Sequence, residues 1–111
     1  QRLSRGLGDV YKRQTLNDMI KSLKLFFKQL DSNGIFVIED FNAPIYFEAL
    51  NDAKGKELFI DNLLKNIMKK KIFKSNILSN SDQGYLCENI KDIKIFKGKT
   101  KISDIVFITK K

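Results

Sequence analysis

The segment GIFVIED, residues 34–40, decides the fold of this chain. Its four consecutive apolar residues, 35–38, favour a strand that is buried on both faces, as in a parallel sheet covered by helices. The strand ends on two adjacent acids, Glu39 and Asp40. Because the carboxyl edge of such a sheet is where open α/β folds bind ligands, the pair is a candidate site. The alternative is a polar turn in which Asp40 caps the next helix.

The apolar periodicity of the chain predicts the elements around this strand. The predicted helices cover residues 15–31, about 56–70 and about 81–90, with a short helix that has Pro44 in its first turn. The two predicted strands that close the chain cover residues 93–96 and 105–108 and are joined by a turn over 97–104. Thr15 and Asp18 have the spacing of a helix cap. We therefore predict an α/β fold with a three-stranded mixed sheet, one strand plus a terminal antiparallel hairpin, and flanking helices.

Composition limits the classes of protein to consider. The chain has 111 residues, of which 42% are hydrophobic, so it is one domain at most, or part of one. No apolar run approaches the ~20 residues of a membrane span. The single cysteine, Cys87, excludes an intrachain disulfide framework, so we expect a cytoplasmic location. Because the chain has no histidine, catalysis within it would need carboxylates, Lys, Tyr or Cys.

The first fourteen residues differ from the rest in composition, since all three arginines fall within residues 1–13. The run SRGLGDVYKRQ, residues 4–14, resembles the in-frame translation of a transposase-type sequencing adapter. The last bases of that adapter, GAT GTG TAT AAG AGA CAG, encode residues 9–14. The likeness implies that residues 1–14 are non-native and that residues 15–111 are a fragment whose N-terminal part is missing. The alternative is a genuine basic arm.

The net charge of +8 raises another alternative, a small basic module that binds nucleic acid. Residues 1–14 contribute four basic side chains and one acidic one, which leaves +5 for the remainder. The densest basic run, Lys69 to Lys71 with Lys74, either attracts phosphate or forms a solvated helix end. Only Phe73 lies beside it to stack on a base. The remainder is also rich in Ile, Lys and Asn, whose codons are AT-rich, so the lysine excess fits a low-GC genome.

The order of elements carries a family likeness. A helix is followed by LDSNGIFVIED, residues 30–40, then by a helical insertion and a hairpin whose last strand is SDIVFI, residues 103–108. This pattern over residues 15–111 resembles the C-terminal half of class I S-adenosylmethionine-dependent methyltransferases, which have a Rossmann-like fold. In that fold the final strand is inserted beside the fifth. The likeness is closest to the macrocin O-methyltransferase and cephalosporin-biosynthesis methyltransferase group, whose fifth strand also ends in a Glu-Asp pair.

The resemblance implies roles for residues near the end of the strand. Glu39 and Asp40 would be two of three carboxylates that bind Mg²⁺, an ion that prefers oxygen ligands. Tyr46 and Phe47, which follow the strand, either line the substrate pocket or pack the insertion. The implied reaction is O-methylation of a small-molecule or sugar-containing substrate, with S-adenosylmethionine as the methyl donor and Mg²⁺ assisting.

The resemblance also implies that other parts of the site lie before Thr15. These are the glycine-rich cofactor loop, the acid that binds the ribose, the third metal ligand and the usual His base. No Gly-x-Gly segment occurs after residue 14, so we expect residues 15–111 to be inactive alone. We expect neither a membrane nor nucleic acid as a partner. Cys87 is expected to be a small helix residue, and Asp104 a turn acid before the last strand.

A filter-binding assay with nucleic acid at increasing salt concentration distinguishes the methyltransferase fragment from the small nucleic-acid-binding module. We expect residues 15–111 to bind no nucleic acid even at low salt, because we expect the lysine side chains to be solvated at the surface. Retention that is strong at low salt and falls steeply as salt rises would instead establish the nucleic-acid-binding module.

Overall fold

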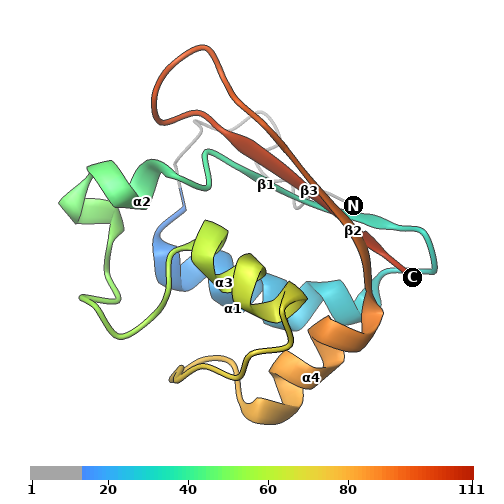
Figure 1. The fold of residues 1–111 in the computed structure, drawn as a ribbon. Coiled ribbons are helices and arrows are strands. Elements are labelled where there is room, and N and C mark those ends of the chain that lie inside the picture. The colour runs from blue at the N-terminus through green and yellow to red at the C-terminus, as the bar shows by residue number, and fades with distance from the viewer. Residues whose placement is uncertain (1–13) are drawn as a thin grey trace.

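The computed structural model describes residues 14–111 (Figure 1). The predicted adapter-derived segment, residues 1–14, lies outside the described residues except for Gln14. The helices are α1 (Leu16–Phe26), α2 (Ala43–Tyr46), α3 (Ile60–Met68) and α4 (Asn80–Asn89), with 3-10 turns at Phe27–Gln29 and Glu48–Leu50. The strands are β1 (Ile35–Glu39), β2 (Ile90–Phe96) and β3 (Ile105–Lys110). The chain is therefore a mixed α/β domain with the predicted order of elements.

Within residues 14–111 the three strands form a sheet with β3 in the middle, in the order β1-β3-β2. Both pairs are antiparallel: Phe107 of β3 lies opposite Val37 of β1 and opposite Lys94 of β2. The predicted hairpin is confirmed, and so is the place of the final strand beside β1. The prediction of a mixed sheet is wrong, because the two strands that run in the same direction, β1 and β2, are separated by β3.

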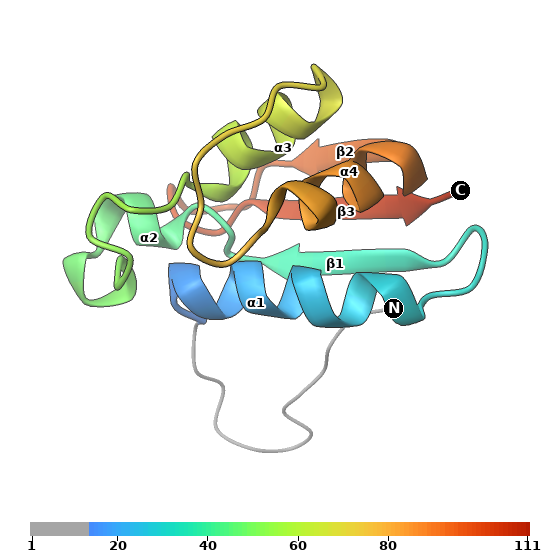
Figure 2. The ribbon, with the colours of Figure 1, turned by 90° about the horizontal axis from the view of Figure 1, so that it is seen from below.

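Helices α1, α3 and α4 cover one face of this sheet, as two views of the ribbon show (Figure 1 and Figure 2). The core lies between this helix layer and the inward side chains of the strands. We call α1 together with the 3-10 turn that follows it the first helical segment. The fully buried members of the core include Leu16, Met19, Ile20, Leu23 and Phe27 from this segment, Phe36 from β1, Ile60 and Leu63 from α3, and Val106 and Ile108 from β3. Each such side chain stabilises the fold by about 1.5–3 kcal/mol relative to its exposed state.

The opposite face of the sheet is only partly covered. Along β1 the side chains alternate, so that Ile35 is 39% exposed and Val37 is half-buried. The prediction that this strand is buried on both faces is therefore wrong, because the described helices lie on one side only. Phe96 and Phe107 pack edge to face here, with ring centroids 5.6 Å apart. We call this side, formed by Ile35, Val37, Phe96, Ile105 and Phe107, the outer face.

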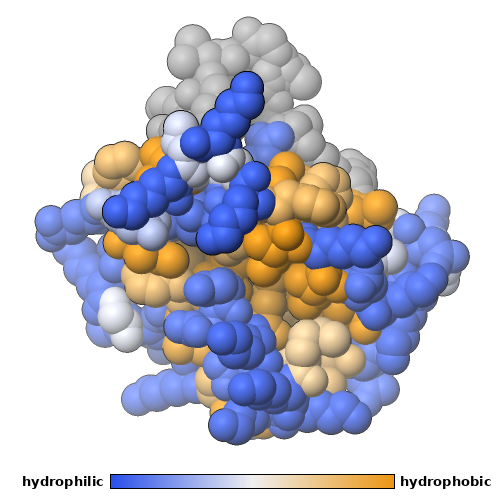
Figure 3. Space-filling model, turned by 45° about the horizontal axis from the view of Figure 1, so that its top comes forward, coloured by the Kyte–Doolittle hydropathy of each residue, from blue (hydrophilic) through white to orange (hydrophobic). Residues whose placement is uncertain are grey.

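Figure 3 turns the top of Figure 1 toward the viewer and shows apolar residues in the middle of the surface, bordered by hydrophilic ones. Phe96 is 53% exposed despite its contact with Phe107. The outer face thus leaves apolar side chains at the surface of the described chain.

Helix α1 begins where the sequence predicts. Thr15 Oγ1 accepts a hydrogen bond from the backbone N–H of Asp18 at 3.2 Å, which satisfies one of the donors at the helix start. The α-helix ends at Phe26 and continues only as a 3-10 turn, so it is shorter than the predicted 15–31. Across residues 14–111, none of the helices has the length and apolar composition that crossing a membrane requires.

Lys110 joins the end of β3 to the end of this helical segment. Its Nζ donates hydrogen bonds to the carbonyl oxygens of Lys28 and Leu30, at 3.1 and 2.8 Å. The same ammonium group lies 5.6 Å from the centre of the Tyr85 ring. Although Lys110 is only 9% exposed, its charge is satisfied by helix-end carbonyls, which carry the negative end of the helix dipole, and by an aromatic face.

The segment between α2 and α3 is irregular. Pro44 lies in the first turn of α2, as predicted. Helix α3 begins at Ile60 rather than near residue 56, so the prediction placed its start too early. Lys54 and Gly55 both have positive φ, 50° and 84°, a backbone conformation that a helix cannot contain.

Helix α4 begins with a capping box and an ion-pair cluster. Ser79 Oγ accepts a hydrogen bond from Asp82 N at 3.1 Å, and the Asp82 carboxylate accepts one from Ser79 N at 3.0 Å. That carboxylate lies 3.6 Å from Nζ of Lys24 and 3.4 Å from Nζ of Lys28, both on the first helical segment. Burial raises the pKa of Asp82, but the hydrogen bonds from Ser79 and the two lysines outweigh it, so its pKa is lowered.

This lowered pKa predicts an acid-sensitive contribution to stability. A carboxyl group with a depressed folded-state pKa stabilises the fold above its ordinary pKa, and the contribution is lost as pH falls through the folded value. We therefore expect the free energy of unfolding, measured with urea, to fall between about pH 5 and pH 2, and to fall less in Asp82→Asn. The matched control is Glu88→Gln, an exposed acid on the same helix. Parallel pH curves for the wild type and Asp82→Asn would contradict this role.

Candidate functional site

The end of β1 places Glu39 and Asp40 at one edge of the described sheet. Glu39 is the last residue of the strand and lies opposite Ile105 of β3. Asp40 has a φ of 53°, in the left-handed region, so the chain leaves the strand direction immediately after Glu39. Both acids are half-buried, and neither is without an interaction partner. The pair therefore belongs to a formed turn.

Asn42 fixes this turn to the loop between β2 and β3. Its Nδ2 donates a hydrogen bond to Lys101 O at 2.7 Å, and its Oδ1 accepts one from Asp104 N at 3.1 Å. The backbone N–H of Phe41 donates to Asp104 O at 3.2 Å. Because Asn42 is only 7% exposed, its amide group needs these partners. The alternative prediction that Asp40 caps the next helix is wrong, since the N-cap of α2 is Asn42.

Tyr46 and Phe47 lie at the end of α2, close to the same loop. Their side chains are 47% and 43% exposed. Nζ of Lys101 lies 4.9 Å from the centre of the Tyr46 ring, which is a cation–π distance. Neither aromatic residue belongs to the core, and both stand at the surface, where Tyr46 contacts the loop that Asn42 binds. We call Glu39, Asp40, Asn42, Tyr46 and Phe47 the strand-end site.

The strand-end site offers oxygen ligands but not a complete metal shell. Two adjacent carboxylates suit Mg²⁺ by their chemistry, because this ion prefers oxygen donors in an octahedral arrangement. Within the described range 14–111, no three His, Cys, Asp or Glu side chains gather closely enough to hold a metal ion. These residues thus supply at most the Glu39–Asp40 pair, and a third carboxylate would have to come from elsewhere.

The other residues singled out from the sequence have structural surroundings. Oδ1 of Asp104 accepts a hydrogen bond from Gly98 N at 3.2 Å, which makes Asp104 a turn acid, as predicted. Cys87 is a half-buried residue of α4 that packs against the core. The basic run at Lys69 to Lys71 with Lys74 follows the end of α3 and is exposed, which fits both of its predicted roles.

Asn42 is the residue of this region that sequence reasoning missed. Asn stabilises turns through its own side chain, so its position shortly after the strand is a local signal. Its actual partners lie 59 and 62 residues further along the chain. The link that it makes between the strand end and the β2–β3 loop is therefore not visible in the local sequence.

Comparisons of this chain with protein-family models, with curated proteins and with solved structures found no match. The fold and the site define an α/β domain with an antiparallel three-stranded sheet and an acidic pair at the end of its first strand.

The substitution Asn42→Ala tests how the strand-end site is held. We expect it to lower the free energy of unfolding by about 1–3 kcal/mol, because it removes two hydrogen bonds, one to Lys101 O and one from Asp104 N. Urea denaturation measures this loss, and hydrogen exchange at the Asp104 amide should become faster. The control is Asn62→Ala on the exposed side of α3, which should be close to neutral. An Asp104 amide that exchanges as slowly as in the wild type would show that Asn42 does not hold the loop.

Proposed function

We propose that residues 15–111 are the C-terminal portion of a class I S-adenosylmethionine-dependent methyltransferase domain. The domain methylates a hydroxyl group of a small-molecule or sugar-containing substrate, with Mg²⁺ assisting. The observation that carries the proposal is the sheet order. The last strand, β3, lies antiparallel beside β1, the strand that ends in Glu39 and Asp40. The family resemblance implies this same place for the final strand.

The sheet order is informative because chain proximity alone favours a different one. Strands that follow one another usually pair as neighbours, which would give the order β1-β2-β3. Here β3 is inserted between the two earlier strands instead. This insertion does not depend on the Glu-Asp motif, so motif and topology support the proposal separately.

The outer face and the free side of β1 support a larger domain. Ile35 and Phe96 on the outer face are 39% and 53% exposed. Within the described residues, β3 is the one strand that pairs with β1. Folded domains ordinarily cover apolar faces and unpaired strand edges. A further strand beside β1 and a second helix layer, as in a Rossmann-like fold, would cover both surfaces.

In the proposed reaction, the strand-end site binds the metal ion and the substrate and orients the substrate hydroxyl group. Glu39 and Asp40 would hold Mg²⁺ through carboxylate oxygens, and Asn42 keeps their turn in place. The ion, when bound, lowers the pKa of a coordinated hydroxyl group. Tyr46 and Phe47 supply an exposed aromatic wall for the substrate, which holds the hydroxyl in the geometry that methyl transfer requires.

In this proposal, the activity belongs to the complete methyltransferase domain and not to residues 15–111 alone. The glycine-rich cofactor loop and the ribose-binding acid that the family resemblance implies would precede Thr15. No Gly-x-Gly segment occurs in residues 15–111. In this proposal they therefore supply residues that bind the metal ion and the substrate, but not the loop that binds the cofactor. We expect them to be inactive alone.

The reading frame upstream of Thr15, in an intact copy of the gene, tests the family assignment. We expect a predicted strand followed by a Gly-x-Gly turn within about 150 residues ahead of Thr15. A continuous upstream frame without that strand and turn would overturn the assignment.

The substitutions Glu39→Gln and Asp40→Asn, made in that full-length protein, test the metal role. We expect each to lower kcat/KM by about 10–100-fold and to raise the Mg²⁺ concentration needed for half-maximal activity, because each removes a charged ligand. The control is Glu48→Gln, an exposed acid just beyond α2. If both variants keep wild-type activity and Mg²⁺ dependence, the pair is only a turn.

A further inference from the structure

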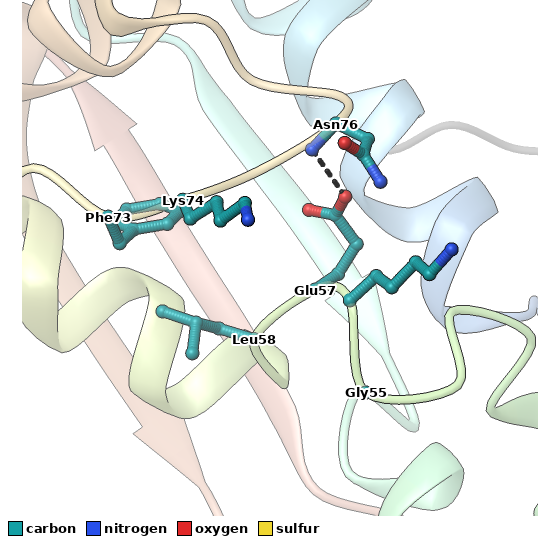
Figure 4. A pocket seen from close by; sticks show the side chains of 7 residues that line it. Gly55, Glu57, Leu58, Phe73, Lys74 and Asn76 are labelled. Carbon is teal, nitrogen blue, oxygen red and sulfur yellow. Dashed lines mark hydrogen bonds between the residues drawn. The ribbon is translucent and has the colours of Figure 1, made fainter.

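A hollow lies between the segment that precedes α3 and the segment that precedes α4 (Figure 4). Its volume is about 500 Å³, within the range of about 300–1,000 Å³ typical of small-molecule sites. The side chains that line it are Lys56, Glu57 and Leu58 from the first segment and Phe73, Lys74 and Asn76 from the second. It shares no residue with the strand-end site.

Glu57 ties the two sides of the hollow together. Its carboxylate accepts hydrogen bonds from the hydroxyl group of Ser75 and, at 2.7 Å, from the backbone N–H of Asn76 (Figure 4). Ser75 Oγ accepts a further hydrogen bond from Leu78 N at 2.9 Å. Glu57 is only 8% exposed, and both of its carboxylate oxygens accept hydrogen bonds. Its carboxylate therefore stabilises the wall of the hollow and does not bind a ligand.

Gln83 of α4 holds the second side of the hollow in place. Its Oε1 accepts a hydrogen bond from Phe73 N at 3.0 Å, and its Nε2 donates to Phe73 O at 2.8 Å. The same Nε2 donates to Leu78 O at 3.1 Å, and the side chain is 2% exposed. The backbone that carries Phe73 is thus fixed before any ligand arrives, which lowers the entropy cost of binding.

The lining of the hollow combines cations with an apolar surface. Lys56 and Lys74 are exposed, and within residues 14–111 their ammonium groups make no hydrogen bond or ion pair. Figure 4 shows the side chain of Lys74 reaching across the hollow toward Glu57. Phe73 and Leu58 are half-buried and add an aromatic ring and an aliphatic side chain. Two exposed lysines and an aromatic ring in one lining suit an anion that has a flat apolar part.

We propose that this hollow binds a small organic anion with a planar apolar body, of the class of aromatic carboxylates. The anionic group pairs with the exposed ammonium groups of Lys56 and Lys74, and the planar body packs against Phe73 and Leu58. The lysines supply long-range attraction, while the ring contact supplies shape selection. This inference does not rest on the proposed methyltransferase activity, because it concerns a different set of residues and a property of this chain alone.

A titration of the 111-residue chain with 2-naphthoate, followed by ¹H–¹⁵N NMR, tests the proposal. We expect saturable shifts at the backbone amides of residues 55–58 and 73–76, with a Kd on the order of 1 mM or tighter. The neutral analogue 2-naphthamide has the same flat body without the charge. It should bind about tenfold more weakly, because it forms no ion pair with the lysines.

Matched lysine variants locate the site. The double variant Lys56→Gln with Lys74→Gln should weaken 2-naphthoate binding about tenfold and leave the rest of the spectrum unchanged. The control is Lys69→Gln with Lys71→Gln, which removes the same charge from exposed lysines that do not line the hollow. Phe73→Leu keeps an apolar wall but removes the ring, so it should weaken the naphthoate and naphthamide complexes alike.

Three results would overturn the proposal. The first is the absence of saturable shifts at residues 55–58 and 73–76 up to about 10 mM 2-naphthoate. The second is equal affinity for the anion and its neutral amide. The third is an equal loss of affinity in the two lysine double variants, which would reduce the effect to net charge.

Discussion

The central position of β3 is the constraint on which the rest of the structure depends. This strand supplies the hydrogen-bond partners of both β1 and β2. Its inward residues Val106 and Ile108 are fully buried beneath the helix layer, and Lys110 at its end binds the carbonyl groups that terminate the first helical segment. Sheet, helix layer and the position of the Glu39–Asp40 turn therefore all depend on a single strand that comes last in the order of elements.

The irregular segments of the chain are held by buried polar side chains that bind backbone groups. Asn42 binds the β2–β3 loop to the end of β1, Glu57 binds the turn at Ser75, and Gln83 binds both backbone groups of Phe73. Each of these three polar residues is less than 9% exposed. Because such groups are costly to leave without partners, they fix loops nearly as firmly as a regular element does. Both candidate binding regions are built on links of this kind.

The elements with strong local signals were predictable from the sequence, and those that depend on distant partners were not. Thr15 and the apolar stripe that follows it define α1, and two apolar runs around a polar turn define the hairpin. The start of α3 was placed too early because apolar spacing does not reveal the positive φ angles of Lys54 and Gly55. The buried charge of Lys110 was equally invisible, since its carbonyl partners lie 80 to 83 residues earlier in the chain.

In the candidate site, too, some features were predictable from the local sequence and others depend on distant residues. The acids Glu39 and Asp40 stood out by residue type and by their position at a strand end, which are local features. The link through Asn42 and the exposure of Tyr46 and Phe47 depend on where the β2–β3 loop comes to lie. Burial on one face rather than two also depends on how many helix layers a sheet meets, which four apolar residues in a row cannot specify.

The order of the strands along the chain has a consequence for biosynthesis. A ribosome produces β1 and β2 before β3, so both earlier strands leave the exit tunnel without the neighbour that they need. Until β3 follows, their apolar side chains and unpaired backbone groups are exposed to other nascent chains and to chaperones. Folding of this sheet is therefore delayed until after its last strand has been translated. Translation that stops before Ile105 would release two strands that cannot pair as they do here, rather than a smaller version of the same fold.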